Sequence, residues 1–205
     1  MDSRLFERPS AGGGGEPGGA APKVPIPVKI VVAGGFAVGK TTFVGSISEI
    51  DPLTTEAAMT QVSEGVDDTG DNAAKVATTV AMDFGRITLG NSDLILYLFG
   101  TPGQARFHFM WDELIRGAIG AVVLVDTSRL ADCFAAVDYF ERRKVPFVVA
   151  VNCFDGKVLH ALDAVREALD VSPDVPIFHT DARERGSTRD ALLCLVQHAL
   201  VRTRS

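Results

Sequence analysis

Residues 34–41, GGFAVGKT, constrain the fold of this chain more than any other feature. They match the pattern G-x-x-x-x-G-K-[ST], follow the apolar, β-branched run VKIVVAG and precede a segment with helical character. In such a strand–loop–helix unit, main-chain N–H groups surround phosphate oxygens, the lysine adds charge and the threonine hydroxyl can bind Mg²⁺. The motif therefore predicts a phosphate-binding site at the end of a buried strand.

The rest of the chain alternates apolar strands with helix-period segments, as a parallel sheet between helix layers requires. Residues 78–89 and 93–100 are separated only by the turn residues Gly90, Asn91 and Ser92, so they predict an antiparallel hairpin. We therefore expect a three-layer α/β fold of the P-loop NTPase type. Its sheet should have six strands, mostly parallel, with one antiparallel edge strand.

Two C-terminal segments have apolar residues at helical spacing. Each predicts a helix with one stripe of side chains facing the core. The stripes are Val158, Leu162, Val165 and Leu169 in the first helix, and Leu192, Val196 and Leu200 in the second.

Two segments fit neither pattern. Residues 1–27, rich in Gly and Pro, have almost no apolar side chains to bury, so we expect a flexible tail ahead of a nucleotide-binding domain over residues 28–205. Residues 51–78 are polar and weakly periodic. A loop this long inside a domain is usually functional, and we interpret it so.

Composition excludes some classes of binding partner and indicates a cellular compartment. The net charge of -6 opposes a broad surface for nucleic acid or anionic lipid, so a phosphate ligand needs a local pocket. The three cysteines are far apart and form no CxxC pair, which favours a reducing cytoplasm. The first residues, MDSRLFERPS, lack the continuous apolar stretch typical of a signal peptide, and the sequence contains no apolar run of about 18 residues, so we expect neither a signal peptide nor a membrane span. We expect a cytoplasmic protein that reaches a membrane only through partners.

Polar residues follow three further strands, at the edge where α/β sheets bind ligands. Gly103 and Gln104 follow residues 94–99, and the glutamine is a candidate for orienting water. Asn152 and Asp155 follow the next apolar strand; a carboxylate there can accept from the two adjacent donors of guanine, which adenine lacks. The amide of Ala182 can donate to a carbonyl of the base. The phosphate loop by itself does not distinguish between a kinase, an ATPase and a GTPase, because all three classes use such a loop.

The order of these segments, GGFAVGKT, Thr79, GTPGQ, NCFD and TDAR, resembles the five nucleotide motifs of Ras-like small GTPases over about residues 28–203. GTPGQARF and VNCFDG are similar to the conservon-type GTPases of actinobacteria, distant relatives of the gliding-polarity GTPases. The resemblance implies GTP or GDP with Mg²⁺ as ligands and slow GTP hydrolysis.

The resemblance also implies a role for each motif residue. Lys40, Thr79 and Gln104 would act in catalysis, Thr79 by closing over the γ-phosphate, and Thr41 and Thr79 would bind the metal. Gly103 would sense the γ-phosphate. The nucleotide would contact Gly34, Gly35, Phe36, Ala37, Val38, Gly39, Lys40, Thr41, Thr42, Gly103, Asn152, Asp155 and Ala182.

Three positions depart from the family pattern. Gly100 stands where an Asp helps hold the magnesium shell, and Asp83 is a possible substitute. Cys153 replaces a lysine whose stem covers the base. Phe36 puts a bulky side chain in the phosphate loop, where it can limit the approach of a helper protein.

The sequence is compatible with two functions. The first is a GTP-dependent switch; the second is a scaffold with a structural nucleotide that is never hydrolysed, because Gly100 and Cys153 weaken the site. A small-molecule kinase would leave NCFD and TDAR without a role. The resemblance implies activating, exchange and effector proteins, including a partner of roadblock-type fold and a membrane histidine-kinase-like protein. An arginine finger would come from Arg86, Arg106 or a partner.

Overall fold

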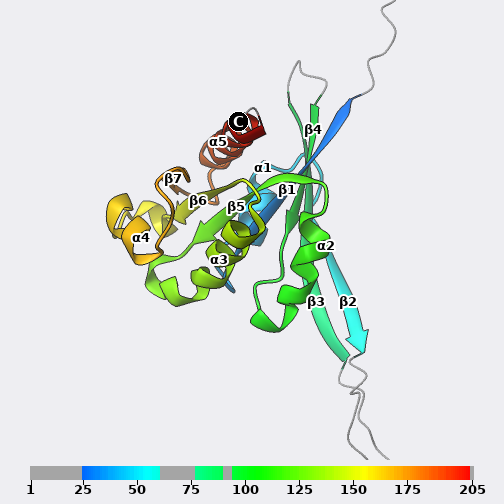
Figure 1. The fold of residues 1–205 in the computed structure, drawn as a ribbon. Coiled ribbons are helices and arrows are strands. Elements are labelled where there is room, and N and C mark those ends of the chain that lie inside the picture. The colour runs from blue at the N-terminus through cyan, green and yellow to red at the C-terminus, as the bar shows by residue number, and fades with distance from the viewer. Residues whose placement is uncertain (1–24, 61–76, 90–93, 204–205) are drawn as a thin grey trace, which may run out of the picture.

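The computed structural model describes residues 25–60, 77–89 and 94–203. In this part of the chain seven strands form one sheet, with helices on both of its faces (Figure 1). The strands are β1 (Ile26–Gly34), β2 (Leu53–Thr60), β3 (Ala77–Thr88), β4 (Leu94–Gly100), β5 (Ala118–Val125), β6 (Phe147–Asn152) and β7 (Ile177–Thr180). The α-helices are α1 (Lys40–Ile47), α2 (Trp111–Ile115), α3 (Phe134–Arg143), α4 (Leu162–Ala168) and α5 (Arg185–Thr203), and 3₁₀ turns are η1 (Ala105–Met110), η2 (Thr127–Cys133) and η3 (Phe154–Gly156).

The strand order is β2-β3-β4-β1-β5-β6-β7, and only β3 runs against the others in the described sheet. The three-layer α/β fold is confirmed. The strand count was one too low: Leu53–Thr60, within the predicted loop, forms the edge strand β2, so β3 lies inside the sheet. Residues 61–76 and the hairpin turn lie outside the described residues.

The core has two halves, one on each face of the sheet. Side chains of α1 and α5 pack on one face, and those of α2, α3 and α4 pack on the other. The central strands are apolar toward both halves, and all six residues of β6 are buried. This burial fixes the C-terminal ends of β1, β4, β5, β6 and β7 along one edge, where the loops that follow them meet.

The boundaries differ from the sequence predictions in two places. Strand β1 begins at Ile26, two residues before the expected start of the domain, and residues 1–24 of the predicted tail lie outside the described residues. Helix α4 begins only at Leu162, so Val158 is exposed and does not belong to its stripe. Within the described ranges, no helix combines the length and the apolar character needed to cross a bilayer.

Candidate nucleotide-binding site

The phosphate loop, residues 34–39, joins the buried end of β1 to the first turn of α1. Gly34 and Gly39 have φ angles of 138° and 104°, which L side chains rarely adopt. A Cβ at Gly34 would lie 2.4 Å from the carbonyl oxygen of Leu124, and one at Gly39 would lie 2.8 Å from Nδ2 of Asn152. Both motif glycines are therefore required by close packing as well as by backbone conformation.

Lys40 is the first residue of α1, and its side chain is buried beneath the loop. Its Nζ donates to the carbonyl oxygens of Gly34, at 3.0 Å, and Gly35, at 2.5 Å. Burial lowers the pKa of Lys40 to about 8. The ammonium group is held where phosphate oxygens can compete with these carbonyls for it.

Thr41, Asp83 and Gly100 form the candidate magnesium site. The Thr41 hydroxyl donates to Oδ2 of Asp83 at 2.8 Å, and the Asp83 side chain is buried. Asp83 pairs with Gly100 across β3 and β4, and a Cβ on Gly100 would lie 3.0 Å from Oδ2 of Asp83. The Asp83 carboxylate thus lies where an acidic side chain at position 100 would project.

Hydroxyl and carboxylate oxygens are the ligands that Mg²⁺ prefers, so Thr41 and Asp83 fit this ion. In the part of the chain that the structure describes, no three His, Cys, Asp or Glu side chains gather as a metal site. A magnesium ion here would therefore depend on these two side chains together with phosphate oxygens.

The loop that follows β4 lies directly against the phosphate loop. A Cβ on Gly103 would lie 2.7 Å from Nζ of Lys40, 2.8 Å from the carbonyl oxygen of Gly35 and 2.9 Å from Cα of Phe36. Only glycine fits this approach. Gln104 comes next, with its side chain exposed to solvent at the start of η1.

Trp111 anchors the other end of this segment. Its ring is buried, and its Nε1 donates to the carbonyl oxygen of Pro102 at 3.4 Å. The ring packs edge-on against Tyr139 of α3, whose hydroxyl donates to Asp112. The Arg143 guanidinium donates to both oxygens of the same carboxylate, each at 2.6 Å. Helix α2 is thereby fixed to α3, and the loop from Gly100 to Met110 is held at both ends.

Asn152 connects the phosphate loop to the loop that follows β7. Its buried side chain donates from Nδ2 to the carbonyl oxygen of Val38 at 2.9 Å and accepts from the amide of Ala182 at 3.1 Å. In this structure the Ala182 amide therefore bonds to Asn152. For the Ala182 amide to donate to a base as predicted, its hydrogen bond to Asn152 must break, or the amide must donate to both acceptors at once.

Asp155, predicted to select the base, is exposed at a left-handed position with φ 56°. Its carboxylate pairs with Arg183 at 2.8 Å, and the same guanidinium binds both oxygens of Asp181. The hydrogen bonds that Arg183 donates to the carboxylates of Asp181 and Asp155 raise the pKa of its guanidinium. Sequence reasoning passed over Asp181 and Arg183, although both stand in the TDAR segment at a strand end.

A cavity of about 470 Å³ opens beside the phosphate loop, between the ends of β5 and β6. Its volume lies in the range of roughly 300–1,000 Å³ common for small-ligand sites. It is lined by Ala37, Asp126, Thr127, Ser128, Arg129, Val151, Asn152, Cys153, Phe154, Asp155, Lys157, Leu159 and His179.

Two predicted groups are not at the phosphate loop in this structure. Thr79 lies in β3 opposite Ala58, four residues from Asp83 and so about 13 Å along the strand. Its closure over a phosphate needs a movement of the β2–β3 pair. Arg86 lies beside the end of α1, where its main chain bonds to Ser48 and Glu49.

The fold and the phosphate loop define a P-loop NTPase fold with a site for nucleotide. A family model described as "Conserved hypothetical ATP binding protein" (ATP_bind_1) matches residues 32–202, so the chain belongs to that family. The chain is 31% identical over 130 residues to "Uncharacterized protein MJ1339" of Methanocaldococcus jannaschii, a match that covers 62% of this chain and 71% of that protein.

Two solved structures have a similar fold. The cytosolic domain of the T. maritima FeoB iron transporter matches with a TM-score of 0.59 at 16% identity, over 85% of this chain and 64% of that one. The FeoB G-domain from Methanococcus jannaschii matches with a TM-score of 0.55 at 13% identity, over 84% and 98%. This chain spans just under two thirds of the first protein, and at these identities the likeness shows the fold alone.

Proposed function

We propose that this chain is a guanine-nucleotide switch that binds GTP with Mg²⁺ and hydrolyses it slowly to GDP. The observation that carries the proposal is the pair of hydrogen bonds made by the Asn152 side chain, one with Val38 of the phosphate loop and one with Ala182 after β7. Asp155 lies three residues after Asn152, in the loop that follows β6. The Asn152 contact joins the phosphate site and the base site into one unit. We also propose that the chain is related to the conservon-type GTPases that its motifs resemble.

The base preference rests on Asp155. Its two carboxylate oxygens can accept from N1–H and N2–H₂ of guanine, a donor pair that adenine lacks. The ion pair with Arg183 is exposed on both sides, and such pairs contribute little free energy, so a base can displace it. The family description names ATP, and the proposal of guanine rests on this carboxylate.

The phosphate chemistry uses residues around the loop. Lys40 and the main-chain N–H groups of the loop would hold the β- and γ-phosphates. Thr41 and Asp83 would hold Mg²⁺, which when bound neutralises phosphate charge. Gln104 would orient a water whose oxygen attacks the γ-phosphorus, while the bond to the bridging oxygen breaks and GDP leaves. Thr79 would close over the γ-phosphate.

Slow hydrolysis is expected because no contact in the described structure places either candidate arginine finger, Arg86 or Arg106, at the phosphate loop. Arg86 lies beside α1, and the Arg106 guanidinium lies 4.9 Å from the ring of Phe107. An arginine supplied by a partner would accelerate the reaction. The partners implied by the resemblance, a roadblock-type protein and a membrane histidine-kinase-like protein, belong to this proposal, as does a cytoplasmic location.

The test is competition against a fluorescent GTP analogue by GTP, XTP and ATP. We expect GTP to compete at least a hundredfold better than ATP, because an unpaired buried donor or acceptor costs a few kcal/mol. Asp155→Asn should weaken GTP and strengthen XTP, whose carbonyl can accept from the new amide. Asp163→Asn, an exposed acid on α4, is the matched control. Equal competition by ATP and GTP on the unaltered protein contradicts the proposal.

A further inference from the structure

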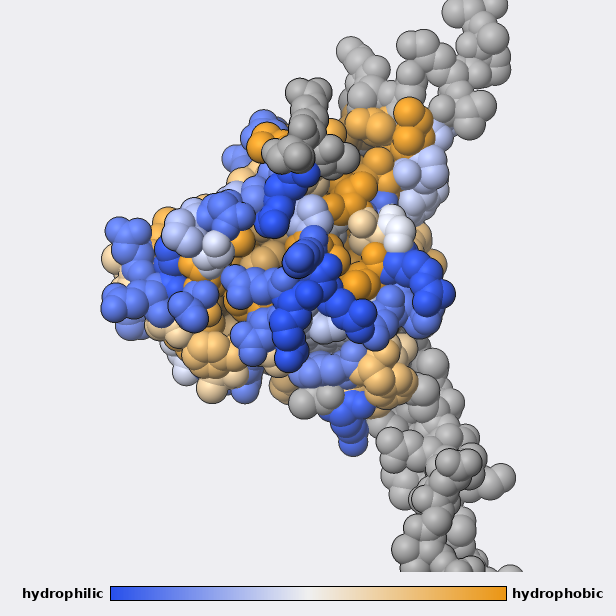
Figure 2. Space-filling model, viewed as in Figure 1, coloured by the Kyte–Doolittle hydropathy of each residue, from blue (hydrophilic) through white to orange (hydrophobic). Residues whose placement is uncertain are grey.

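The apolar stripe of α5 does not stay in the core. Leu192 is buried, but Leu200, two turns further along, is 55% exposed, and Leu193 beside the stripe is 42% exposed. The stripe predicted to face the sheet therefore leaves it toward the C-terminal end of the helix. Figure 2 shows hydrophobic surface between this end of α5 and the starts of β1 and β4.

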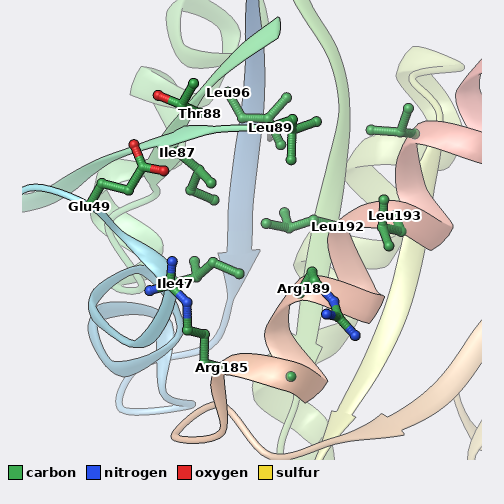
Figure 3. Close-up of a pocket in the computed structure, with 12 residues that line it drawn as sticks. Ile47, Glu49, Ile87, Thr88, Leu89, Leu96, Arg185, Arg189, Leu192 and Leu193 are labelled. Atoms are coloured by element: carbon green, nitrogen blue, oxygen red, sulfur yellow. The ribbon is translucent and has the colours of Figure 1, made fainter. Parts of the chain in front are cut away.

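Two adjoining cavities of about 360 Å³ and 460 Å³ follow this stripe. They share Leu89, Leu96 and Val196 and form a groove between α5 and the β3–β4 pair, which we call the α5 groove. In Figure 3 Leu192 projects from α5 toward the strands, opposite Ile87. The interior is almost entirely aliphatic.

The mouth of the α5 groove is charged. Glu49 lies on the strand side, where hydrogen bonds from the main chain and hydroxyl of Thr88 lower its pKa. Arg185 and Arg189 lie on the first turns of α5 (Figure 3). An occupant with adjacent apolar residues flanked by charges of both signs would match this surface.

The chain itself carries such a segment next to the groove. Strand β1 starts at Ile26, paired with Leu94, and Leu94 and Val28 line the end of the groove. Residues 1–24 come before this point, and within them Leu5 and Phe6 stand together in RLFER. They are followed by the Gly-rich stretch 11–20.

The tether has a suitable length. A Gly-rich linker of twenty residues spans about 25 Å on average. Helix α5 rises about 22 Å from Arg185 to Leu200, which is the length of the groove along it. A segment on such a tether has an effective concentration on the order of 1 mM, so a weak contact is enough to keep it bound.

We propose that residues 4–8 dock in the α5 groove, with Leu5 and Phe6 in its aliphatic interior and their charged neighbours at its mouth. Burial of two large apolar side chains supplies the free energy, and the charges set the orientation. The residues that line the α5 groove are different from those that line the cavity beside the phosphate loop.

Disulfide trapping in the full chain tests this. Phe6→Cys is combined with Leu193→Cys, in a background where the neighbouring Cys194 is changed to Ser; Cys133 and Cys153 are buried. The matched control pairs Phe6→Cys with Leu159→Cys, another exposed leucine, outside the groove. We expect the groove pair to cross-link at least tenfold faster, at a rate unchanged by dilution, and Leu5→Asp to slow it to the control rate.

Equal rates in the two pairs would overturn the proposal, as would a rate proportional to protein concentration, which would assign the groove to a second copy. A second measurement avoids the groove substitution. Leu5→Asp with Phe6→Asp should raise binding of an apolar fluorescent dye several-fold, whereas Gly13→Asp with Gly14→Asp, of equal charge, should not. Equal dye binding by the two variants would also contradict docking.

Discussion

Lys40 shows how one buried side chain can make nucleotide binding sensitive to pH. Burial lowers its pKa to about 8 from an ordinary value of 10.5, so its charge is lost as the pH rises through 8. Phosphate oxygens favour the charged form, so binding nucleotide above pH 8 requires uptake of a proton. The carbonyl contacts to Gly34 and Gly35 are the ones that phosphate would replace.

We therefore predict that nucleotide affinity is constant below about pH 7 and falls by up to about tenfold per pH unit above pH 8. Titration of a fluorescent GTP analogue between pH 6.5 and 9 measures this. Lys40→Arg keeps its charge throughout this range and should bind more weakly with a flat profile. A flat profile for the unaltered protein would refute the assignment, and Lys40→Ala should lose tight binding at every pH.

Asp83 carries a second prediction. Its carboxylate accepts from Thr41 and lies beside Gly100, so Asp83→Asn should raise the Mg²⁺ concentration needed for tight GTP binding by about tenfold or more. The preference between GTP and ATP should not change. Analogue dissociation measured against Mg²⁺ concentration gives the result, with Asp138→Asn, exposed on α3, as control. An unchanged Mg²⁺ dependence would remove Asp83 from the site.

The loop between β4 and α2 joins the phosphate site to the helical layer. A Cβ on Gly103 would lie 2.7 Å from Nζ of Lys40, and eight residues later Trp111 bonds to Pro102 and packs on Tyr139. Since Trp111 is the one tryptophan of the chain, its fluorescence reports on this loop. A γ-phosphate that displaces Gly103 should change its emission.

We predict that a non-hydrolysable GTP analogue changes the emission of Trp111 and that GDP changes it much less. Stopped-flow fluorescence with each nucleotide measures the difference. Lys40→Ala, treated in the same way, should give no response to either. Identical emission with both nucleotides would mean that the loop does not respond to the γ-phosphate.

Elements with strong local signals could be predicted from sequence. The phosphate loop and the buried parallel strands follow from β-branched runs and fixed glycines, and the hairpin from its short turn. Strand β2 could not, because LTTEAAMT has no regular alternation of apolar and polar residues and forms a strand through its pairing with β3. The early start expected for α4 failed because Val158 precedes the helix and is exposed.

Contacts within the candidate site depend on register and could not be predicted in the same way. Asp83 lies beside Gly100 because these two residues are paired in the register of β3 and β4. The bridge from Asn152 to Val38 links residues 114 positions apart. Strand ends indicate which residues can meet, but the identity of each hydrogen-bond partner requires the packed structure.

On the scale of the whole molecule, the phosphate loop, the loop after β4 and the Asn152 contact are compatible both with the proposed switch and with a scaffold that holds a structural nucleotide. Asp83 supplies a carboxylate where Gly100 has none, which removes one reason for the scaffold. Cys153 remains a departure, and its thiol is buried. The two functions differ in one property, which is whether the bound nucleotide is hydrolysed in a reaction that needs Gln104.

The decisive measurement is γ-phosphate release from GTP-loaded protein in a single turnover at saturating Mg²⁺, with and without cell extract. We predict a rate on the order of 10⁻⁴ s⁻¹, faster with extract, and a fall of at least tenfold in Gln104→Leu, with GTP affinity nearly unchanged. Gln197→Leu, exposed on α5, should behave as the unaltered protein. Equal rates for the unaltered and Gln104→Leu proteins in both conditions would contradict the switch.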